Sequence, residues 1–377
     1  MGSEAGTGTE TETEPTPPSR FAAGRFEWID GSLFALSAAS LLVVVVGGLV
    51  QVSFGAFSMT FVEAWGAVFD LEVLSNPQTW EAFLLGGEVP EMGKRSLVVW
   101  NVRLPRVFVA VLVGMNLAVS GAIFQAVTGN ELASPFTFGV SSGAGLSILL
   151  TLVVFSGLSA FLPLIASAGG AIAFLVVYAI AWSGGTSPVR LVLAGVIVGT
   201  VFGSVQTALF FFADDIGVVQ SAIAWTTGSL TGTDWEQVRM ALPWTVLAMV
   251  LALVSSRQLN VLLLGESTAK SLGMSVERVR FVLSGVAVLA AASIAVAGIV
   301  GFVGLIVPHV VRNIVGSDYR KLVVGCVFAG PALVVAVDAG ARLALNPIQV
   351  PAGIVTGLVG GPYFLYLMRK RDTMGEI

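Results

Sequence analysis

The sequence predicts an all-α membrane protein that crosses the bilayer about ten times. Hydrophobic residues make up 55% of the 377 residues and charged residues only 11%, whereas a soluble domain carries about 25% charged residues. The mean hydropathy is correspondingly high, at +0.90. The apolar residues gather into blocks of about 20, the length that a helix needs to cross the hydrocarbon core. Since backbone groups in lipid must find their hydrogen bonds within their own segment, each block is expected to be a helix.

Ten apolar blocks follow one another along the chain and define the predicted spans. A further apolar segment at 218–231 comes after the fifth block and is too short to cross. The consecutive valines at 43–46 would favour a strand in a soluble chain, but within a long apolar block they indicate a helix. The predicted spans are 33–53, 106–127, 139–157, 161–182, 190–212, 238–256, 279–297, 299–315, 322–341 and 350–368.

The distribution of positive charge predicts that both termini are cytoplasmic, because short cytoplasmic loops of membrane proteins carry an excess of Lys and Arg. With the N-terminus inside, six of the 19 Lys and Arg residues fall outside and the other 13 fall inside. The opposite orientation would reverse this bias. The six outer residues are Lys94, Arg95, Arg103, Arg106, Arg239 and Arg342.

The chain divides into a ten-helix domain at 26–371 and two tails. The N-terminal tail, 1–25, is dominated by Glu, Thr and Pro, so it is predicted to be disordered and acidic. It lacks the basic start and apolar stretch of a secretory signal, and the C-terminal tail is 372–377. Within the domain, an external segment at 54–105 and a cytoplasmic segment at 257–278 are too long for simple connectors. Loops of this length are usually functional.

Few residues could carry catalysis or hold a metal. The single cysteine, Cys326, and the single histidine, His309, exclude a disulfide framework and a Cys/His metal cage. His309 follows a proline at the inner end of the eighth span, where a packing or capping role is expected. Asp338 lies four residues before Arg342 near the outer end of the ninth span, which predicts a local ion pair on one helix face. An intramembrane protease or a proton pump would need more ionisable groups at depth.

Nucleotide and nucleic-acid binding find no support in the sequence. The net charge of −4 forms no basic patch, so nucleic acid is not an expected partner. The one Gly-Lys pair, Gly93 and Lys94, is followed by Arg95 rather than Ser or Thr, and Glu88 occupies the position of the first glycine in a phosphate-binding loop. The chain is therefore not expected to be an enzyme, and any ATP that drives it must bind to another chain.

Ordered motifs indicate a known family. Residues 101–145, NVRLPRVFVAVLVGMNLAVSGAIFQAVTGNELASPFTFGVSSGAG, resemble the permease subunits of ABC importers for vitamin B12, ferric siderophores and haem. The resemblance covers roughly residues 30–371. The further matching stretches are RLVLAG at 190–195, LLLGESTAKSLGM at 262–274, GIVGFVGLIVPHVVR at 298–312, DAGARLAL at 338–345 and PAGIVTGLVGGPYFLYLMRK at 351–370.

This resemblance implies a multi-pass permease of the plasma membrane that acts as a homodimer. Its implied partners are a second copy of itself, two ATP-binding subunits, an external substrate-binding protein and the lipid bilayer. The implied cargo is a metal chelate carried into the cytoplasm, with cobalamin slightly favoured over a ferric siderophore or haem. No cofactor is implied for this chain, because the partner ATPase would bind ATP and Mg.

The resemblance also assigns roles to particular residues. Outward-facing arginines would receive acidic residues of the binding protein, as charged rims steer encounter, and these are Arg103, Arg106 and Arg342. The segment from Gly265 to Met274 matches the part that docks into the ATPase, with the contacts Glu266, Ser267, Ala269, Leu272 and Gly273. A translocation path along the dimer axis would be lined by the fifth span and the segment after it, including Thr207, Phe210 and Phe211.

Two inner gate positions are implied as well. Asn130 and Leu132 match one gate, and Thr186 with Ser187, before the fifth span, is the second candidate. The family usually has Asn-Pro-Leu at the first gate, whereas this chain has Glu131 in place of the proline. This departure leaves the geometry of the turn open and places a negative charge near the inner opening.

Two other readings compete with the importer. An ion-coupled secondary transporter driven by Na⁺ or H⁺ would require buried acids or broken helices around a midplane site, and the predicted spans offer little of either. A membrane scaffold without transport activity would need no coupling segment and no ATPase. A neighbouring ATPase gene and a neighbouring binding-protein gene would favour the importer over both.

Overall fold

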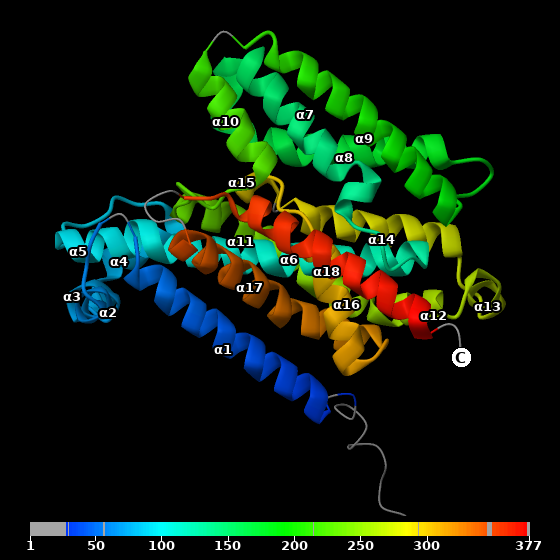
Figure 1. Ribbon diagram of the computed structural model, residues 1–377, viewed down its shortest axis with the longest axis horizontal. Coiled ribbons are helices and arrows are strands. Elements are labelled where there is room, and N and C mark those ends of the chain that lie inside the picture. Colours follow the sequence, from blue (N-terminus) through cyan, green and yellow to red (C-terminus); the bar gives the residue numbers. More distant parts are fainter. Residues whose placement is uncertain are drawn as a thin grey trace, which may run out of the picture.

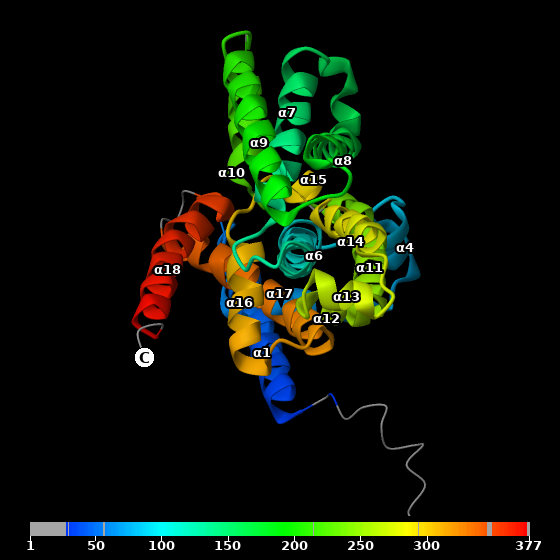
Figure 2. The ribbon, with the colours of Figure 1, turned by 90° about the vertical axis from the view of Figure 1, so that its right-hand side faces the viewer.

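The computed structural model describes residues 28–374 except 29, 56, 214, 293 and 345–348. The predicted N-terminal tail lies outside the described residues, as do the last three residues of the C-terminal tail. Within the described part the regular structure is helical (Figures 1 and 2).

Each of the ten predicted spans contains a helix, which confirms an all-helical membrane fold with seven to ten apolar helices. Seven of the described helices are long and apolar enough to cross a membrane, and three shorter apolar ones accompany them. The ten helices are α1 (Gly31–Ser53), α6 (Leu104–Thr128), α7 (Val140–Val153), α8 (Leu162–Ala181), α9 (Pro188–Phe210), α11 (Trp235–Val254), α14 (Val276–Ala291), α16 (Val303–Val315), α17 (Tyr319–Ala344) and α18 (Ala352–Met374).

Shorter helices occupy the connecting segments. The apolar segment after the fifth span forms α10 (Ile216–Thr227). The external segment forms α2 (Phe61–Val68), α3 (Leu71–Ser75), α4 (Pro77–Leu85) and α5 (Lys94–Val98), with a π-helical turn at Val99–Arg103 that leads into α6. The cytoplasmic segment forms α12 (Ser256–Leu263) and α13 (Glu266–Ser271), and α15 (Ile294–Ala297) lies between α14 and α16. Two 3₁₀ turns, Pro135–Phe138 and Ser156–Phe161, flank α7.

Local sequence signals explain where several helices begin. Asp30 caps α1 by accepting a hydrogen bond from the amide of Leu33. Thr60 and Glu63 form a reciprocal capping box at the start of α2. Asp234 caps α11 in the same way. Each cap satisfies amide groups that the first turn of a helix leaves without partners.

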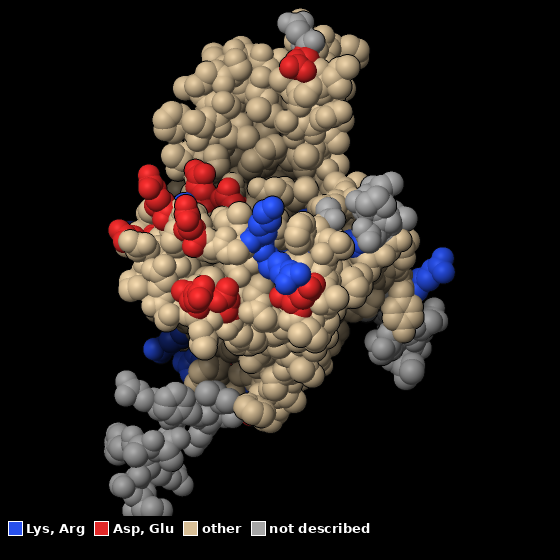
Figure 3. All heavy atoms as spheres, turned by 90° about the vertical axis from the view of Figure 1, so that its left-hand side faces the viewer, with Lys and Arg blue, Asp and Glu red and all other residues tan. Residues whose placement is uncertain are grey.

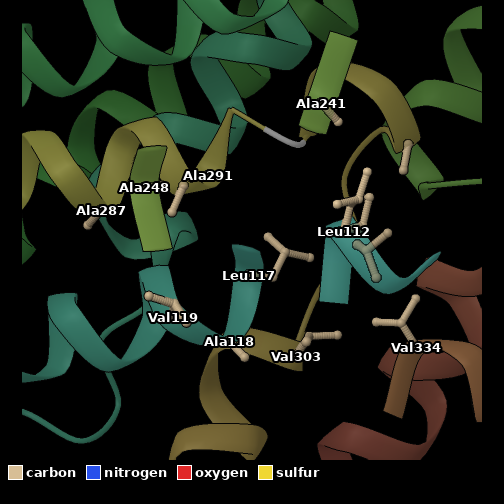
Figure 4. Close-up of a cluster of buried hydrophobic side chains, with 14 of the residues drawn as sticks. Leu112, Leu117, Ala118, Val119, Ala241, Ala248, Ala287, Ala291, Val303 and Val334 are labelled. Atoms are coloured by element: carbon tan, nitrogen blue, oxygen red, sulfur yellow. The ribbon is translucent and has the colours of Figure 1, made fainter. Parts of the chain in front are cut away.

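Helix α6 is the central element of the fold. Figure 2 shows it between α7–α10 on one side and α1, α16 and α17 on the other. The helices that pack closely against α6 require small residues at the contact points. A Cβ atom at Gly121 would overlap the carbonyl group of Gly304, and one at Gly114 would overlap that of Gly330. Transmembrane helices approach this closely only where both surfaces carry small residues. Figure 4 shows the apolar side chains that α6 contributes to the core, among them Leu112 and Leu117.

The ends of the described chain lie on one side of the molecule. In Figure 1 the start of α1 and the end of α18 lie at the same end as α12 and α13, whereas α2–α5 lie at the opposite end. This arrangement agrees with the even number of predicted spans. The cytoplasmic assignment of that end remains a prediction from the charge distribution. We name the two ends by this prediction: the end with α12 and α13 is the inner end, and the end with α2–α5 is the outer end.

The boundary between the seventh and eighth predicted spans differs from the sequence expectation. Instead of a helix from residue 299, residues 298–302 are not helical, and Phe302 has a positive φ of 65° directly before α16. Main-chain hydrogen bonds join this segment to the end of α10: the amide of Ile299 donates to Trp225 O at 2.9 Å, and the amide of Ser229 donates to Ala297 O at 2.8 Å. These bonds satisfy backbone groups for which lipid offers no partner, and a break in a membrane helix is tolerated where protein covers it in this way. We call this region, 225–229 with 297–299, the main-chain joint.

Candidate functional site

The outer end of α6 carries two of the three arginines predicted to face outward, and both are buried. The Arg103 side chain donates to the main-chain carbonyl groups of Val52 and Phe57, beside the end of α1, and only 2% of the residue is exposed. Carbonyl oxygens at the end of α1 and in the external segment thus hold this guanidinium inside the fold, and its role in docking stays a prediction.

Arg106 forms a bidentate ion pair with Asp338. Nε lies 2.8 Å from Oδ2 and Nη2 lies 2.7 Å from Oδ1, while Nη1 donates to Gln349 Oε1 at 2.8 Å. The two paired side chains are 6% and 0% exposed. This pair of planar groups is the strong geometry for an arginine and a carboxylate. Arg106 is thus fixed between α6 and α17, and its role in docking stays a prediction.

The predicted local pair of Asp338 with Arg342 is also wrong. Asp338 points to α6, and Arg342 instead donates to the carbonyl oxygen of Gln51 at 3.0 Å. Arg342 is half-buried, so its guanidinium does not form an open cationic rim. Asp338 therefore pairs with Arg106 on a neighbouring helix and not with Arg342, four positions away on its own helix. Arg106 binds both carboxylate oxygens, which is the stronger geometry.

The exposed charge at the outer end is mainly acidic. Figure 3 views this end and shows acidic side chains spread over it around a basic group. Arg95 pairs with Glu63 at 2.7 Å. A groove of about 690 Å³ between α4 and the start of α11 is lined in part by Asp234, Glu236 and Arg239. The exposed acids of this end are Glu72, Glu81, Glu88, Glu91, Asp234 and Glu236.

At the opposite end, α13 presents most of the predicted ATPase contacts to the solvent. Glu266, Ser267, Leu272 and Gly273 are exposed, and Leu272 is 64% exposed although it is apolar. Ala269 is 0% exposed and faces inward from the short helix, so its contact role stays a prediction. Leu272 directly follows this helix.

Glu266 connects α13 to α14. Its carboxylate lies 2.8 Å from Lys270 Nζ and 3.3 Å from Arg280 Nη2. The hydrogen bond from Lys270, followed by the hydrogen bond and charge of Arg280, lowers the pKa of Glu266 below its ordinary value. The side chain of Arg280 is itself only 4% exposed.

The second predicted gate, Thr186, lies against the same arginine. Thr186 donates from its amide and from Oγ1 to Glu277 Oε2, at 3.0 and 2.6 Å. Arg280 Nη1 donates to the carbonyl oxygen of Thr186 at 2.7 Å. Thr186 is buried at 4% exposure, whereas Ser187 is half-buried at the start of α9.

Sequence reasoning did not single out Glu277 and Arg280. The available signal was a pair of opposite charges three residues apart at the start of an apolar helix. Such a pair is ordinarily explained as contact within one helix, and their spacing gave no indication that Thr186, more than 90 residues earlier, is held between them.

The first predicted gate is a tight turn after α6. Asn130 Oδ1 accepts a hydrogen bond from the amide of Leu132 at 2.9 Å, so the asparagine side chain shapes the turn. Leu132 is 44% exposed. The carboxylate of Glu131 lies 3.5 Å from Arg312 Nη1 and 3.6 Å from His309 Nδ1, both on α16. Where the family has a proline, this chain therefore holds the turn to a neighbouring helix with charge.

The residues predicted to line a translocation path lie on a face that this chain leaves uncovered. Thr207 is exposed, Phe210 is half-buried and Phe211 is 86% exposed. Along the whole of α10, Ala222 is the one buried residue that the structure describes. The exposed apolar face of α9 and α10 requires another apolar partner, either lipid or protein.

Comparison with known proteins gives consistent results. The model of the FecCD transport family matches residues 41–370. The Fe(3+)-citrate import system permease protein of Bacillus subtilis is 40% identical over 278 residues, covering 74% of this chain and 83% of the relative. The cobalamin import system permease protein of Halobacterium salinarum is 40% identical over 286 residues, 75% of this chain and 76% of the relative. The hemin transport system permease protein of Yersinia pestis is 34% identical over 339 residues, 88% of this chain and 95% of the relative.

A solved structure is similar over nearly the whole described fold. It is a metal-chelate type ABC transporter in an inward-facing conformation, with a TM-score of 0.73 and 28% sequence identity. The match covers 90% of this chain and 98% of that chain.

Proposed function

Because this chain belongs to the FecCD transport family of multi-pass membrane permeases, we propose that it carries a metal chelate into the cytoplasm, with cobalamin as the first candidate. It is the non-catalytic permease subunit of an ABC importer for iron chelates, cobalamin or haem. The observation that carries this conclusion is the family match over residues 41–370. The choice of cobalamin is supported by the motifs at 101–145 and 262–274 and by the relative from Halobacterium salinarum.

The partner ATPase binds ATP and Mg and docks on α13. Supporting this role, α13 projects beyond the apolar spans, and Ser267 and Leu272 are exposed on it. A polar surface helix with an exposed leucine suits a protein contact better than a lipid contact, because its charged side chains would be poorly solvated among acyl chains.

The external binding protein docks on the outer end, which carries the predicted docking residues Arg103, Arg106 and Arg342 and presents mainly acidic groups at its surface. Arg103 and Arg106 are engaged inside the fold, while the exposed groups there include Glu88 and Glu91. Complementary charge steers encounter and fixes register. A binding protein with basic lobes therefore fits this chain.

A second copy of the chain covers the exposed face of α9, α10 and α18. Support comes from α10, in which Ala222 is the one buried residue that the structure describes, and from exposed apolar side chains on α9 and α18, among them Val196, Ile197 and Leu358. In the homodimer, Thr207, Phe210 and Phe211 line the path for a large chelate. The turns at Asn130–Leu132 and Thr186–Ser187 close the path at the inner end.

An ion-coupled transporter would need a buried acid that is free to exchange a cation. The buried acid at the outer end, Asp338, is instead held by Arg106 in bidentate geometry. Within the described residues, the non-helical stretch at 298–302 is joined to α10 by the hydrogen bond from the amide of Ile299 to Trp225 O. These observations favour the importer.

The test uses proteoliposomes that contain this chain, its ATPase and its external binding protein. ATP-dependent uptake of labelled cobalamin is measured with and without an excess of a ferric siderophore. Uptake that requires ATP and is insensitive to the siderophore is expected. Uptake of the siderophore instead would replace the cargo but keep the importer. Absence of uptake, with no stimulation of ATP hydrolysis by any loaded binding protein, would overturn the importer itself.

A further inference from the structure

We propose that Arg280 is the positioning residue that transmits movement of α13 to the 183–187 turn at the inner end of α9. The proposal rests on the function proposed above, in which α13 contacts the ATPase and Thr186 belongs to the inner gate. It adds a named residue that joins these two regions, which are far apart in sequence.

The first step is the contact between α13 and α14. Arg280 Nη2 lies 3.3 Å from Glu266 Oε2, and Glu266 is the first residue of α13. Glu266 is 43% exposed while Arg280 is 4% exposed. A docking protein can therefore reach the carboxylate, whereas the guanidinium stays inside the fold.

The second step is the contact between α14 and the turn. Arg280 Nη1 donates to the carbonyl oxygen of Thr186 at 2.7 Å and also reaches its Oγ1 at 3.2 Å. Glu277 accepts from the amide and the hydroxyl of the same residue, at 3.0 and 2.6 Å. Thr186 is thus bound through its backbone on both sides, so the turn cannot shift without these two side chains.

The third step is the turn itself. Trp182 and Thr186 form an isolated antiparallel bridge, and the amide of Ser183 donates to Gly185 O at 3.1 Å. Arg190, in the first turn of α9, also donates to Gly185 O at 3.0 Å. Because the turn is closed at both ends and α9 begins at Pro188, a displacement of Thr186 displaces the start of α9.

The charges around Arg280 allow its contacts to change when a partner docks on α13. Arg280 is buried and is neutralised by two carboxylates, Glu266 at 3.3 Å and Glu277 at 3.2 Å. A buried cation that loses one carboxylate gains by closer contact with the other. When the docking partner moves α13 or competes for Glu266, the guanidinium of Arg280 reorients around Glu277, and the carbonyl of Thr186, which it holds at 2.7 Å, moves with it.

The test separates coupling from assembly by measuring uptake and ATP hydrolysis in the same proteoliposomes. For Arg280→Gln, the uptake per ATP hydrolysed is expected to fall about tenfold, within the range of ordinary coupling energies, while hydrolysis continues. Arg280→Lys is expected to recover part of the loss. The matched control is Arg278→Gln, since Arg278 lies two residues earlier on the same helix, is exposed and is not among the proposed ATPase contacts; its uptake per ATP should stay within about twofold of the wild type.

Two results would overturn the proposal: an unchanged uptake per ATP in Arg280→Gln, or an equal loss in Arg278→Gln. If Arg280→Gln does not fold, Glu277→Gln takes its place, because Glu277 is 34% exposed and can be neutralised at lower cost. An unchanged ratio in that variant also overturns the proposal. Uptake by the wild type tests the proposed function separately, since only the ratio between variant and wild type bears on Arg280.

Discussion

Two buried arginines, one at each end of the molecule, differ in how their carboxylate partners are exposed. At the outer end, Arg106 and Asp338 are 6% and 0% exposed and bind through two parallel hydrogen bonds. At the inner end, Arg280 is 4% exposed, but its partners Glu266 and Glu277 are 43% and 34% exposed. The first arrangement has no route for another molecule to compete, so it clamps α6 to α17. The second can exchange partners at the surface, so it suits a region that must respond to a neighbour.

The largest effect is expected from breaking the outer pair. Asp338→Ala leaves a buried guanidinium without its carboxylate and should lower the free energy of unfolding by about 3–5 kcal/mol. The double variant Arg106→Met with Asp338→Leu removes both charges and should recover most of that loss. Thermal unfolding in detergent measures both variants. If the double variant is as unstable as the single one, the pair is not a clamp of the kind described.

A smaller effect is expected at the first gate turn, where the ion pair is half-exposed. Glu131→Gln removes the charge that faces Arg312 and His309. The side chain of Glu131 is 33% exposed, and that of Arg312 is 12% exposed. Partly exposed pairs contribute about 1 kcal/mol or less, so a loss near the upper end of that range is expected. The same unfolding measurement applies, with Glu88→Gln as a control on an exposed acid. A loss of several kcal/mol would instead show that this pair stabilises the fold as strongly as the Arg106–Asp338 pair is expected to.

The smallest effect is a dependence on pH at α13. The hydrogen bond from Lys270, and then Arg280, lowers the pKa of Glu266 in the folded protein, so its contribution to stability is complete above the unfolded pKa, about 4.3. That contribution is lost as the pH falls through the folded pKa. The difference in melting temperature between the wild type and Glu266→Gln should therefore be full at neutral pH and shrink in acid. A difference that grows on acidification would contradict this assignment.

The sequence was sufficient to predict where the helices lie, but it did not predict which charged side chains pair with one another. Ten apolar blocks could be placed because the bilayer fixes the length of a span. The residues 54–105 and 257–278, predicted to be too long for simple connectors, contain short helices. The break at 298–302 was missed, because its hydrogen-bond partners belong to α10, some 70 residues earlier, and no local pattern reports them.

The choice of charge partners failed for the same reason. Asp338 was predicted to pair with Arg342 one helical turn away, yet it binds Arg106, which is 232 residues distant. Arg103 and Arg106 were expected at an open rim. They are buried instead, because the fold brings carbonyl and carboxylate groups close enough to bind their guanidinium groups. Residue spacing predicts contacts within a helix, whereas contacts between helices depend on the packing angle and on which faces are covered.

The main-chain joint has a consequence for how the sequence can diverge. Its bonds run between backbone atoms, including the amide of Gly353 to Gly228 O at 3.0 Å, so exchanging side chains there leaves them in place. The exceptions are Gly228, Gly298 and Gly353, where any Cβ atom would overlap a carbonyl group of the facing segment. Across homologues, this region should therefore tolerate broad substitution around three invariant glycines. The start of α18, joined by the same bonds, should inherit the position of α10 whatever residues the two helices carry.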